Sequence, residues 1–405
     1  MNWGQRAQDR LSDIARCSVD GEGVTRFPFT SQHEAALDAI RSWMSQAGLQ
    51  VHMDAAGTLI GRKDGPEGAP TFLIGSHQDS VRNGGGYDGI MGVVLGCLAL
   101  EKLAADGNEL PFSVEILAFA DEEGVRFPTA LMGPRALAGT FDPAVLAMTD
   151  SDGVSLRNAL AGFGGDPDRV AALARDPAKT LGYLEIHIEQ GPVLEAQDTA
   201  LGIVTGICGI ERNTVTFTGD TGHAGTVPMD SRRDALVAAS DFISAIHDAA
   251  KKVTDLRATI GALSLHPNVV NAIPRAVELT LEIRALNDAV RDDFARLARY
   301  LGDNISGGRR VGFSMERTYE QPAVPCNGDL IDALSTATGA ICPTAPRLPS
   351  GATHDASAMA DLCPISMLFV RCEDGVSHKP EEFAASDDMD AAIQSIAAFL
   401  VALEV

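Results

Sequence analysis

The sequence predicts an α/β protein in which a larger α/β/α domain is interrupted by a smaller, ferredoxin-like α+β module. Apolar, β-prone runs such as 71–74 and 365–370 lead into polar segments that carry histidines and carboxylates. The carboxyl ends of strands are where α/β sheets place their chemistry. Residues 208–323 instead follow the order strand, helix, strand, strand, helix, strand. We therefore expect 1–207 and 324–405 to form the larger domain around this insertion.

The elements of each domain follow from the spacing of apolar residues. The helix that begins after Thr30 and Ser31, for example, has an N-capping residue at its start and apolar residues at helical spacing. In the larger domain the pattern predicts helices over 5–17, 32–48 and 90–103 and strands over 50–53, 58–61, 71–74, 111–120, 184–191 and 365–370. In the inserted module it predicts strands over 214–218, 258–265 and 277–285 and helices over 231–252 and 288–301.

Composition limits the partners. The 405 residues are 45% apolar and include 32 basic against 55 acidic side chains, a formal net charge of −23. No basic tract occurs, so we expect neither a nucleic acid nor an anionic membrane as partner. The start of the chain lacks an apolar signal-peptide core, and no apolar run reaches the length of about 18 residues that a membrane span needs. Seven cysteines without a CxxC pair indicate reduced thiols, as in a cytoplasmic protein.

A short segment broken by glycines carries an imidazole and two carboxylates. His77 and Asp79 follow the run at 71–74, and alternation along extended backbone points them the same way. The glycines at 84–86 let the chain turn back, so that Asp88 can approach the same point. Taken alone, the segment also fits a glycine-rich surface turn.

Three further predicted strands carry polar residues of the same kind. Glu122 and Glu123 follow one strand, His187 lies near the end of another, and His378 follows a third. Adjacent side chains point apart on extended backbone, so one of the two glutamates suits a metal and the other the reacting water. Taken singly, the glutamates also fit a solvated acidic turn and His187 a buried core residue.

Together these segments offer five metal-ligand candidates, which are His77, Asp88, Glu123, His187 and His378. Imidazoles and carboxylates without thiolates suit zinc or manganese, with cobalt or nickel as alternatives. Five ligands suffice for two divalent ions if one carboxylate bridges them, and Asp88 at the glycine turn is the natural bridge. The residual positive charge of such a centre can hold an anionic substrate inside an acidic protein.

The chain resembles the hydantoinase/carbamoylase branch of the M20 metallopeptidase-like amidohydrolases. This branch includes allantoate amidohydrolases, N-carbamoyl-L-amino-acid hydrolases and β-ureidopropionases. The matching segments occur in order along nearly the whole chain and read GSHQDS, GGGYDGIMG, FADEEGVRFP, ALMGPRALAG, HIEQGPVLE, GHAGTVPMDSRRDAL, SGATHDA and GVSHKPEE. Ser80 and Val227 stand where threonine is usual. The resemblance implies an exopeptidase-like, two-metal catalytic domain and a lid domain at 208–323, through which such proteins commonly form homodimers and whose closure completes the site.

The resemblance also implies roles for single residues. The five ligand candidates bind the metals, with Asp88 bridging, and Asp79 orients His77. Glu122 is the general base that takes a proton from the attacking water and passes it to the leaving amine. In the lid, His223 stabilises the oxyanion. The positions matched to substrate binding are Gln190, Asn271, Arg284, Gly351 and His354, of which Asn271 and Arg284 hold the substrate carboxylate.

Within this branch, the segments at 43–48, 54–58 and 121–128 are most similar to allantoate amidohydrolases, which cleave allantoate to ureidoglycine, ammonia and carbon dioxide. We therefore expect hydrolysis of a ureido C–N bond in a small anionic substrate, with allantoate first. N-carbamoyl-L-amino acids are the alternative, because the same metals and carboxylate clamp would serve them. An aminoacylase or peptidase, and a dimeric scaffold without catalysis, are further alternatives. The segment 210–213 has no assigned role.

Overall fold

The computed structural model describes residues 2–403 and divides the chain into two compact units. Unit 2 comprises Gly206–Pro325 and the short segment Pro349–Gly351, and unit 1 comprises the remainder. The insertion therefore begins at 206, where the sequence predicts 208, and ends at 325, where it predicts 323.

The segment Pro349–Gly351 departs from the predicted division, which assigns it to the larger domain. The reason is its hydrogen bonding. The carbonyl of Ser350 accepts from the main-chain N–H of Cys208, and the carbonyl of Gly351 accepts from Nη1 of Arg284.

Unit 1 is built around a mixed sheet with parallel strands at its centre. The strands of this sheet are β1 (Gln50–Met53), β2 (Leu59–Lys63), β3 (Thr71–His77), β4 (Ser113–Phe119), β5 (Thr180–Ile188), β6 (Leu201–Ile207), β12 (Val324–Pro325), β13 (Arg347–Ser350) and β14 (Ile365–Val370). In the division above, β12 and the last residues of β6 and β13 are counted with unit 2. The order is β1-β2-β4-β3-β5-β14-β6-β12, with β13 beside β6. Strand β3 is parallel to β4 and β5, and β5 is parallel to β14. The carboxyl ends of these four strands therefore meet at one edge of the sheet.

The apolar runs form these strands because parallel strands are covered on both faces. Every residue of β4 and β14 is buried. The predicted strands at 111–120 and 365–370 are thus confirmed, whereas β6 is absent from the prediction.

The helices of unit 1 cover this sheet and one another. They are α1 (Trp3–Ile14), α2 (Ser31–Gln46), α3 (Ile90–Ala105), α4 (Met132–Ala138), α5 (Leu156–Gly162), α6 (Val193–Ala196), α9 (Gly328–Gly339), α10 (Ala356–Met359) and α11 (Ser386–Ala402). Helices α1, α3 and α9 pack against α11, and α3 also contacts β3, β4 and β5. The predicted N-cap of α2 is confirmed, since the hydroxyl of Thr30 accepts from the main-chain N–H of His33 at 3.3 Å.

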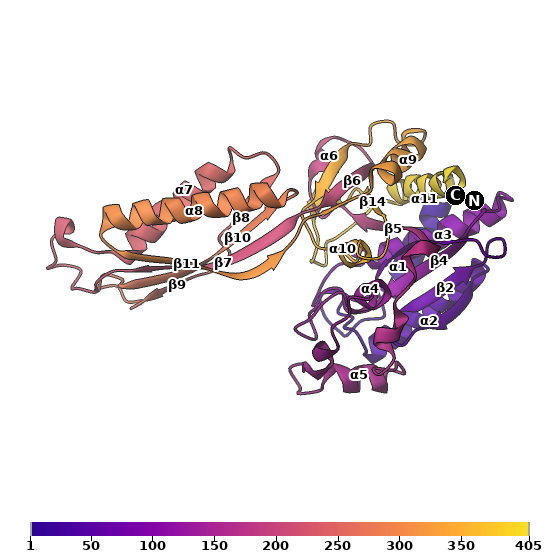
Figure 1. Cartoon of the computed structure of the whole chain (residues 1–405), viewed down its shortest axis with the longest axis horizontal. Helices are drawn as coiled ribbons and strands as arrows, with labels where there is room; N and C mark the ends of the chain where they lie inside the picture. The colour runs from indigo at the N-terminus through magenta and orange to yellow at the C-terminus, as the bar shows by residue number, and fades with distance from the viewer. Residues whose placement is uncertain (1, 404–405) are drawn as a thin grey trace. The chain divides into compact units, whose positions relative to one another are not determined.

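Unit 2 has two helices against one sheet (Figure 1). Its elements are β7 (Gly209–Thr218), α7 (Ala235–Ala250), β8 (Leu256–Thr259), β9 (Leu263–His266), β10 (Ala276–Ala285), α8 (Asp288–Arg309) and β11 (Gly312–Gln321). The order is β11-β7-β10-β8, with β9 also pairing β10. The single strand predicted over 258–265 is interrupted between β8 and β9, where three residues of the chain oppose two of β10 and the register shifts by one residue. Alternate residues of β7 and β10 point into a shared core with both helices.

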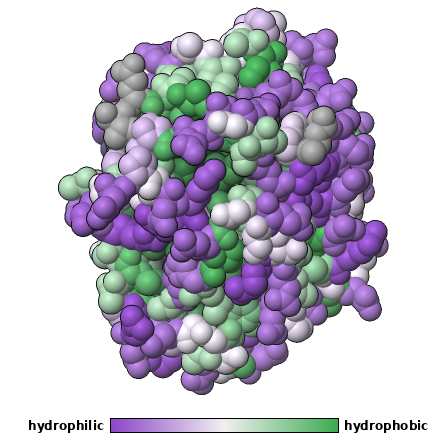
Figure 2. All heavy atoms as spheres, turned by 90° about the vertical axis from the view of Figure 1, so that its right-hand side faces the viewer, coloured by the Kyte–Doolittle hydropathy of each residue, from purple (hydrophilic) through white to green (hydrophobic). Residues whose placement is uncertain are grey.

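The surface matches the composition. Figure 2 shows a face on which hydrophilic residues predominate and apolar residues form small groups between them. Among the described residues, no helix combines the length and the apolar character that crossing a bilayer requires.

Candidate metal centre

Asp88 lies at the centre of a cluster of side chains from the parallel strand ends. Its Oδ1 is 3.0 Å from Nε2 of His187, at the end of β5, and 3.7 Å from Nε2 of His77, the last residue of β3. Its Oδ2 is 3.0 Å from Nε2 of His378, beyond β14. Glu123, beyond β4, places Oε1 3.8 Å from the same nitrogen of His378. The structure thus brings all five predicted ligands together.

The backbone around Asp88 is held by Glu382, a residue to which the sequence analysis assigns no role. Oε1 of Glu382 accepts from the main-chain N–H groups of Tyr87 and Asp88, both at 2.9 Å. Gly89 follows with φ 66°, and a Cβ added there would lie 2.3 Å from the His77 ring. Glu382 lies four residues after His378, at the end of the segment GVSHKPEE. Its place in this matching segment is the feature of the sequence that could have indicated a role at the site.

The imidazoles present their Nε2 atoms because main-chain carbonyls accept from Nδ1. In His77, Nδ1 contacts the carbonyl oxygen of Asp79 at 3.0 Å, and in His187 it contacts the carbonyl of Ile188 at 3.0 Å. A carbonyl can only accept, so Nδ1 carries the proton and Nε2 is left to bind a cation when the ring is neutral.

Asp79 contacts His77 as predicted, but through its main-chain carbonyl and not through its carboxylate. Its carboxylate is 3.7 Å from Nδ1 of His77, beyond hydrogen-bond length. Instead, Oδ1 and Oδ2 accept from the main-chain N–H groups of Glu122 and Glu123 at 3.2 and 3.3 Å. Asp79 thus orients His77 through its carbonyl and the two glutamates through its carboxylate.

The charged groups of the cluster shift one another's pKa values. Burial, followed by the charge of Glu123, raises the pKa of Glu122 well above its usual range. Burial, followed by the charge of Asp88, raises the pKa of Glu123 to about 8. Burial also opposes ionisation of Asp88, but hydrogen bonds from His187 and His378 outweigh it and hold its pKa well below the usual range. A buried group of mutually repelling carboxylates is stabilised by bound cations.

The donor set fits two divalent cations. One group comprises His77, Asp88 and His187, and a second comprises Asp88, Glu123 and His378; the ligand atoms within each lie within 4.8 Å of one another. The two groups share Asp88, as a bridging carboxylate requires. Oε1 of Glu123 is buried without a hydrogen-bond partner. Neither group contains a thiol, which suits metals that take imidazole and carboxylate ligands.

Two other groups of possible ligands adjoin this centre. One combines His77 with Glu122 and Glu123, and the other combines Glu185, His187 and His354. Glu185 is already engaged, because Oε1 accepts from the Ser76 hydroxyl at 2.9 Å and Oε2 from the N–H of Ala356 at 2.8 Å. Both oxygens of Glu185 are therefore occupied by hydrogen bonds, so Glu185 positions neighbouring residues of the centre and does not bind a metal.

Two side chains line the Oδ2 side of Asp88. Nε2 of Gln190 donates to this oxygen at 3.1 Å and to the hydroxyl of Ser377 at 3.0 Å, and Ser377 itself donates to Asp88 at 3.1 Å. Gln190 has φ 56°, and His378, beside Ser377, has φ 60°. Left-handed backbone at non-glycine residues is uncommon and concentrates at functional sites. Ser377 is absent from the predicted site.

His354 is the other predicted substrate residue in unit 1. It is 1% exposed, and its ring centroid lies 4.6 Å from that of His187 in an edge-to-face arrangement. Burial, followed by the charge of His187, lowers the pKa of His354 well below its usual range. It is therefore a neutral ring packed beside a candidate ligand.

The other four predicted residues lie in unit 2. The segments of His223 and Asn271 are paired, since the N–H of Ala224 donates to the carbonyl of Asn271 at 3.0 Å. Nδ1 of His223 accepts from the N–H of Gly225 at 3.1 Å, so a neutral ring carries its proton on Nε2. Arg284 donates from Nε to Glu282 at 2.7 Å and from Nη1 to the carbonyl of Gly351 at 2.6 Å. The structure therefore places these four residues as two pairs, His223 with Asn271 and Arg284 with Gly351.

The fold and site define a metal-dependent hydrolase, and the chain belongs to the peptidase family M20/M25/M40, which it matches over residues 48–402. It is 40% identical over 390 residues to the N-carbamoyl-L-amino acid amidohydrolase of Geobacillus stearothermophilus, covering 96% of this chain and 95% of that one. It is 37% identical over 423 residues to the allantoate deiminase of Arabidopsis thaliana, covering 96% of this chain and 81% of that protein.

A solved structure of an amidase is also similar to this chain. The hydantoinase/carbamoylase family amidase of Burkholderia multivorans superposes with a TM-score of 0.91 at 31% identity, over 98% of this chain and 97% of that one. The chain is thus a hydrolase of carbamoyl or ureido C–N bonds, and the relatives do not separate the two substrate classes.

Proposed function

We propose that the protein hydrolyses the ureido C–N bond of a small carboxylate, with allantoate as the first substrate to test. The arrangement that supports this proposal is the pair of three-ligand groups joined by Asp88, with Glu122 adjoining them. Bound metals would supply activation of water at neutral pH and Lewis-acid polarisation of the ureido carbonyl.

The chain's own residues divide the remaining work. Glu122 takes the proton of the attacking water at its carboxylate and delivers it to the leaving nitrogen, and Asp79 holds its backbone for this task. His223 donates from Nε2 to the oxygen on which negative charge develops. Arg284 keeps its Nη2 donors for the substrate carboxylate, because Nε and Nη1 are engaged within unit 2.

N-carbamoyl-L-amino acids are the second candidate substrates. The observation that favours them is the identity to the Geobacillus amidohydrolase, which exceeds that to the plant allantoate deiminase. Both substrate classes carry a carboxylate and release ammonia, so the residues described above serve either one.

The deciding experiment measures ammonium release by the purified protein. The metals are removed with a chelator, and zinc or manganese is then restored separately. Allantoate and a set of N-carbamoyl-L-amino acids are supplied in parallel, with N-acetyl-L-amino acids as controls that cannot yield ammonia. Release from allantoate alone supports the first substrate, and release from the carbamoyl amino acids supports the second. Hydrolysis of the acetyl compounds alone would refute the ureide assignment.

We also propose a homodimer formed through unit 2. Large apolar side chains are exposed there at Met229, Leu263, Val269 and Val270, with 73%, 42%, 54% and 103% of their surface accessible. Exposed apolar side chains that lie together are typical of an association surface, and Leu263, Val269 and Val270 lie within eight residues of one another in the chain. Light scattering should give twice the chain mass, and Val270→Asp should shift the protein towards monomer. A monomeric unsubstituted protein would refute this proposal.

A further inference from the structure

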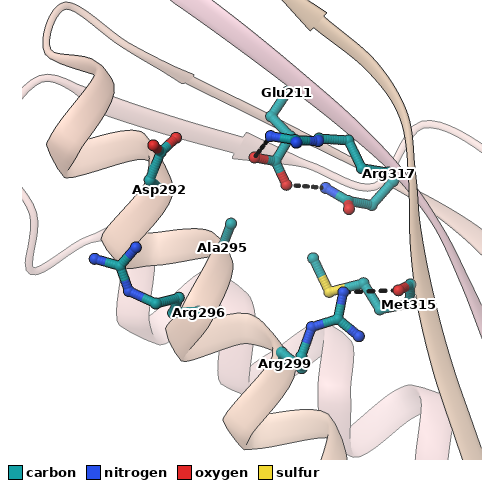
Figure 3. Close-up of a pocket in the computed structure, with 8 residues that line it drawn as sticks. Glu211, Asp292, Ala295, Arg296, Arg299, Met315 and Arg317 are labelled. Atoms are coloured by element: carbon teal, nitrogen blue, oxygen red, sulfur yellow. Dashed lines mark hydrogen bonds and ion pairs between the residues drawn. The ribbon is translucent and has the colours of Figure 1, made fainter.

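A pocket in unit 2 is lined by Glu211 and Asn213, two residues of the segment 210–213 that the proposed function leaves unexplained. It has a volume of about 400 Å³ and lies between the helix α8 and the strands β7 and β11. Volumes of this size hold small metabolites. Figure 3 shows its lining residues, which are Glu211, Asn213, Asp292, Ala295, Arg296, Arg299, Met315 and Arg317.

The base of the pocket is a buried polar pair. Glu211 is 5% and Asn213 is 1% exposed, and Nδ2 of Asn213 donates to Oε1 of Glu211 at 2.8 Å. This bond fixes the orientation of the amide, because only its nitrogen can donate to a carboxylate. Oδ1 of Asn213 is then an acceptor without a partner. A buried acceptor in this state is costly, and a ligand N–H would relieve the cost.

The second oxygen of Glu211 is also lightly engaged. Its partner is Nη1 of Arg317 at 3.8 Å, which is beyond hydrogen-bond length (Figure 3). Arg317 bonds more closely to Glu320, at 2.8 Å. The base of the pocket therefore offers a carboxylate and an amide oxygen to a cationic or N–H-rich group.

The rim offers the opposite charge. Arg299 donates to the carbonyl of Met315 at 2.8 Å and forms no ion pair with any acidic residue of the described chain. By contrast, Arg296 pairs with Asp293, and Asp292 pairs with Arg291. Arg299 is thus the guanidinium with donors available for an anion, and a planar guanidinium suits a carboxylate. Ala295 and Met315 supply an apolar wall.

We propose that this pocket binds a small α-amino acid with an apolar side chain. The ammonium group binds to Glu211 and Asn213, the carboxylate binds to Arg299, and the side chain packs on Ala295 and Met315. The site lies entirely within unit 2, and the proposal does not depend on which ureide the enzyme hydrolyses.

The test is calorimetric titration of the metal-loaded, full-length protein with L-valine. Isovalerate lacks the amino group and isobutylamine lacks the carboxylate, so each probes one half of the ligand. Both should bind at least tenfold more weakly than L-valine, which corresponds to about 1.4 kcal/mol. If isovalerate bound as tightly as L-valine, the pocket would be a general anion site and the proposal would be overturned. An absence of L-valine binding would also overturn it.

Variants locate the binding. Arg299→Gln removes the charge and leaves a shorter polar side chain, and Glu211→Gln keeps the shape of the base; each should weaken L-valine binding at least tenfold. Arg309→Gln is the matched control, because Arg309 also lies on α8 but pairs with Asp241 outside the pocket. Amino acid bound at the catalytic metals would be unaffected by all three changes. Equal affinity of Arg299→Gln and Arg309→Gln would therefore overturn the proposal.

Discussion

Replacing Gly89 by alanine tests how the metal centre is constructed. Gly89 has φ 66° and ψ −62°, a conformation that costs other residues about 1–3 kcal/mol. In addition, the new Cβ would lie 2.3 Å from Cε1 of His77, where ordinary contacts begin at 3.4 Å. The imidazole must therefore move by roughly 1 Å, and a misplacement of that size at a reacting centre costs about 10²-fold in rate.

Gly107→Ala is the matched control. Gly107 also has a left-handed φ, 74°, but an added Cβ meets nothing within 4 Å. Both variants should lose about 1–3 kcal/mol of unfolding free energy in denaturant titrations. Only Gly89→Ala should also bind metal more weakly, measured by elemental analysis after dialysis, and lose about 10²-fold of its hydrolytic rate. If Gly89→Ala retained metal and activity as well as Gly107→Ala does, the packing of Gly89 against His77 would have no role in the centre.

Three further changes address the base, the substrate clamp and acid stability. Glu122→Gln should retain both metals but lose about 10²–10⁴-fold in kcat; full activity would exclude Glu122 as the base. Arg284→Ala should raise KM for carboxylate substrates by about tenfold or more, with Arg284→Lys intermediate, and an unchanged KM would contradict the clamp. His33 is buried, with Nδ1 accepting from the N–H of Phe29. Burial lowers its pKa from 6.5 to about 3, so the unfolded chain binds its proton first and stability falls as the pH drops below 6.5. From pH 7 to pH 5 this amounts to about 2 kcal/mol, and His33→Asn, which keeps an acceptor, should abolish that part of the pH dependence. Parallel stability curves for both proteins would show that His33 titrates normally.

The ligand types were predictable because they depend on local features. His77 is the last residue of a strand, and Glu123 and His378 lie in the segments that follow strands. Parallel pairing then places the ends of β3, β4, β5 and β14 at one edge of the sheet. Residues that are far apart in the chain are therefore expected to lie close together on the basis of the strand pattern alone.

The supporting contacts were not predictable in the same way. Glu382 binds the main-chain N–H groups of Tyr87 and Asp88 across nearly 300 positions of the chain. The carboxylate of Asp79 holds the turn at Glu122 and not the imidazole beside it. In both cases the partner is a backbone N–H, and no residue type in the sequence marks which N–H will face a given carboxylate.

By itself, the sequence determined the residue types of the centre, the order of strands and helices in the inserted module, and the family to which the chain belongs. The tertiary structure decided that Asp88 is shared by two ligand groups, that Ser377 and Glu382 support it, and that Glu211 and Asn213 form the base of a separate pocket. The reason is physical. Periodicity and local chemistry are written along the chain, whereas the distance between two side chains from different elements is set by how those elements pack.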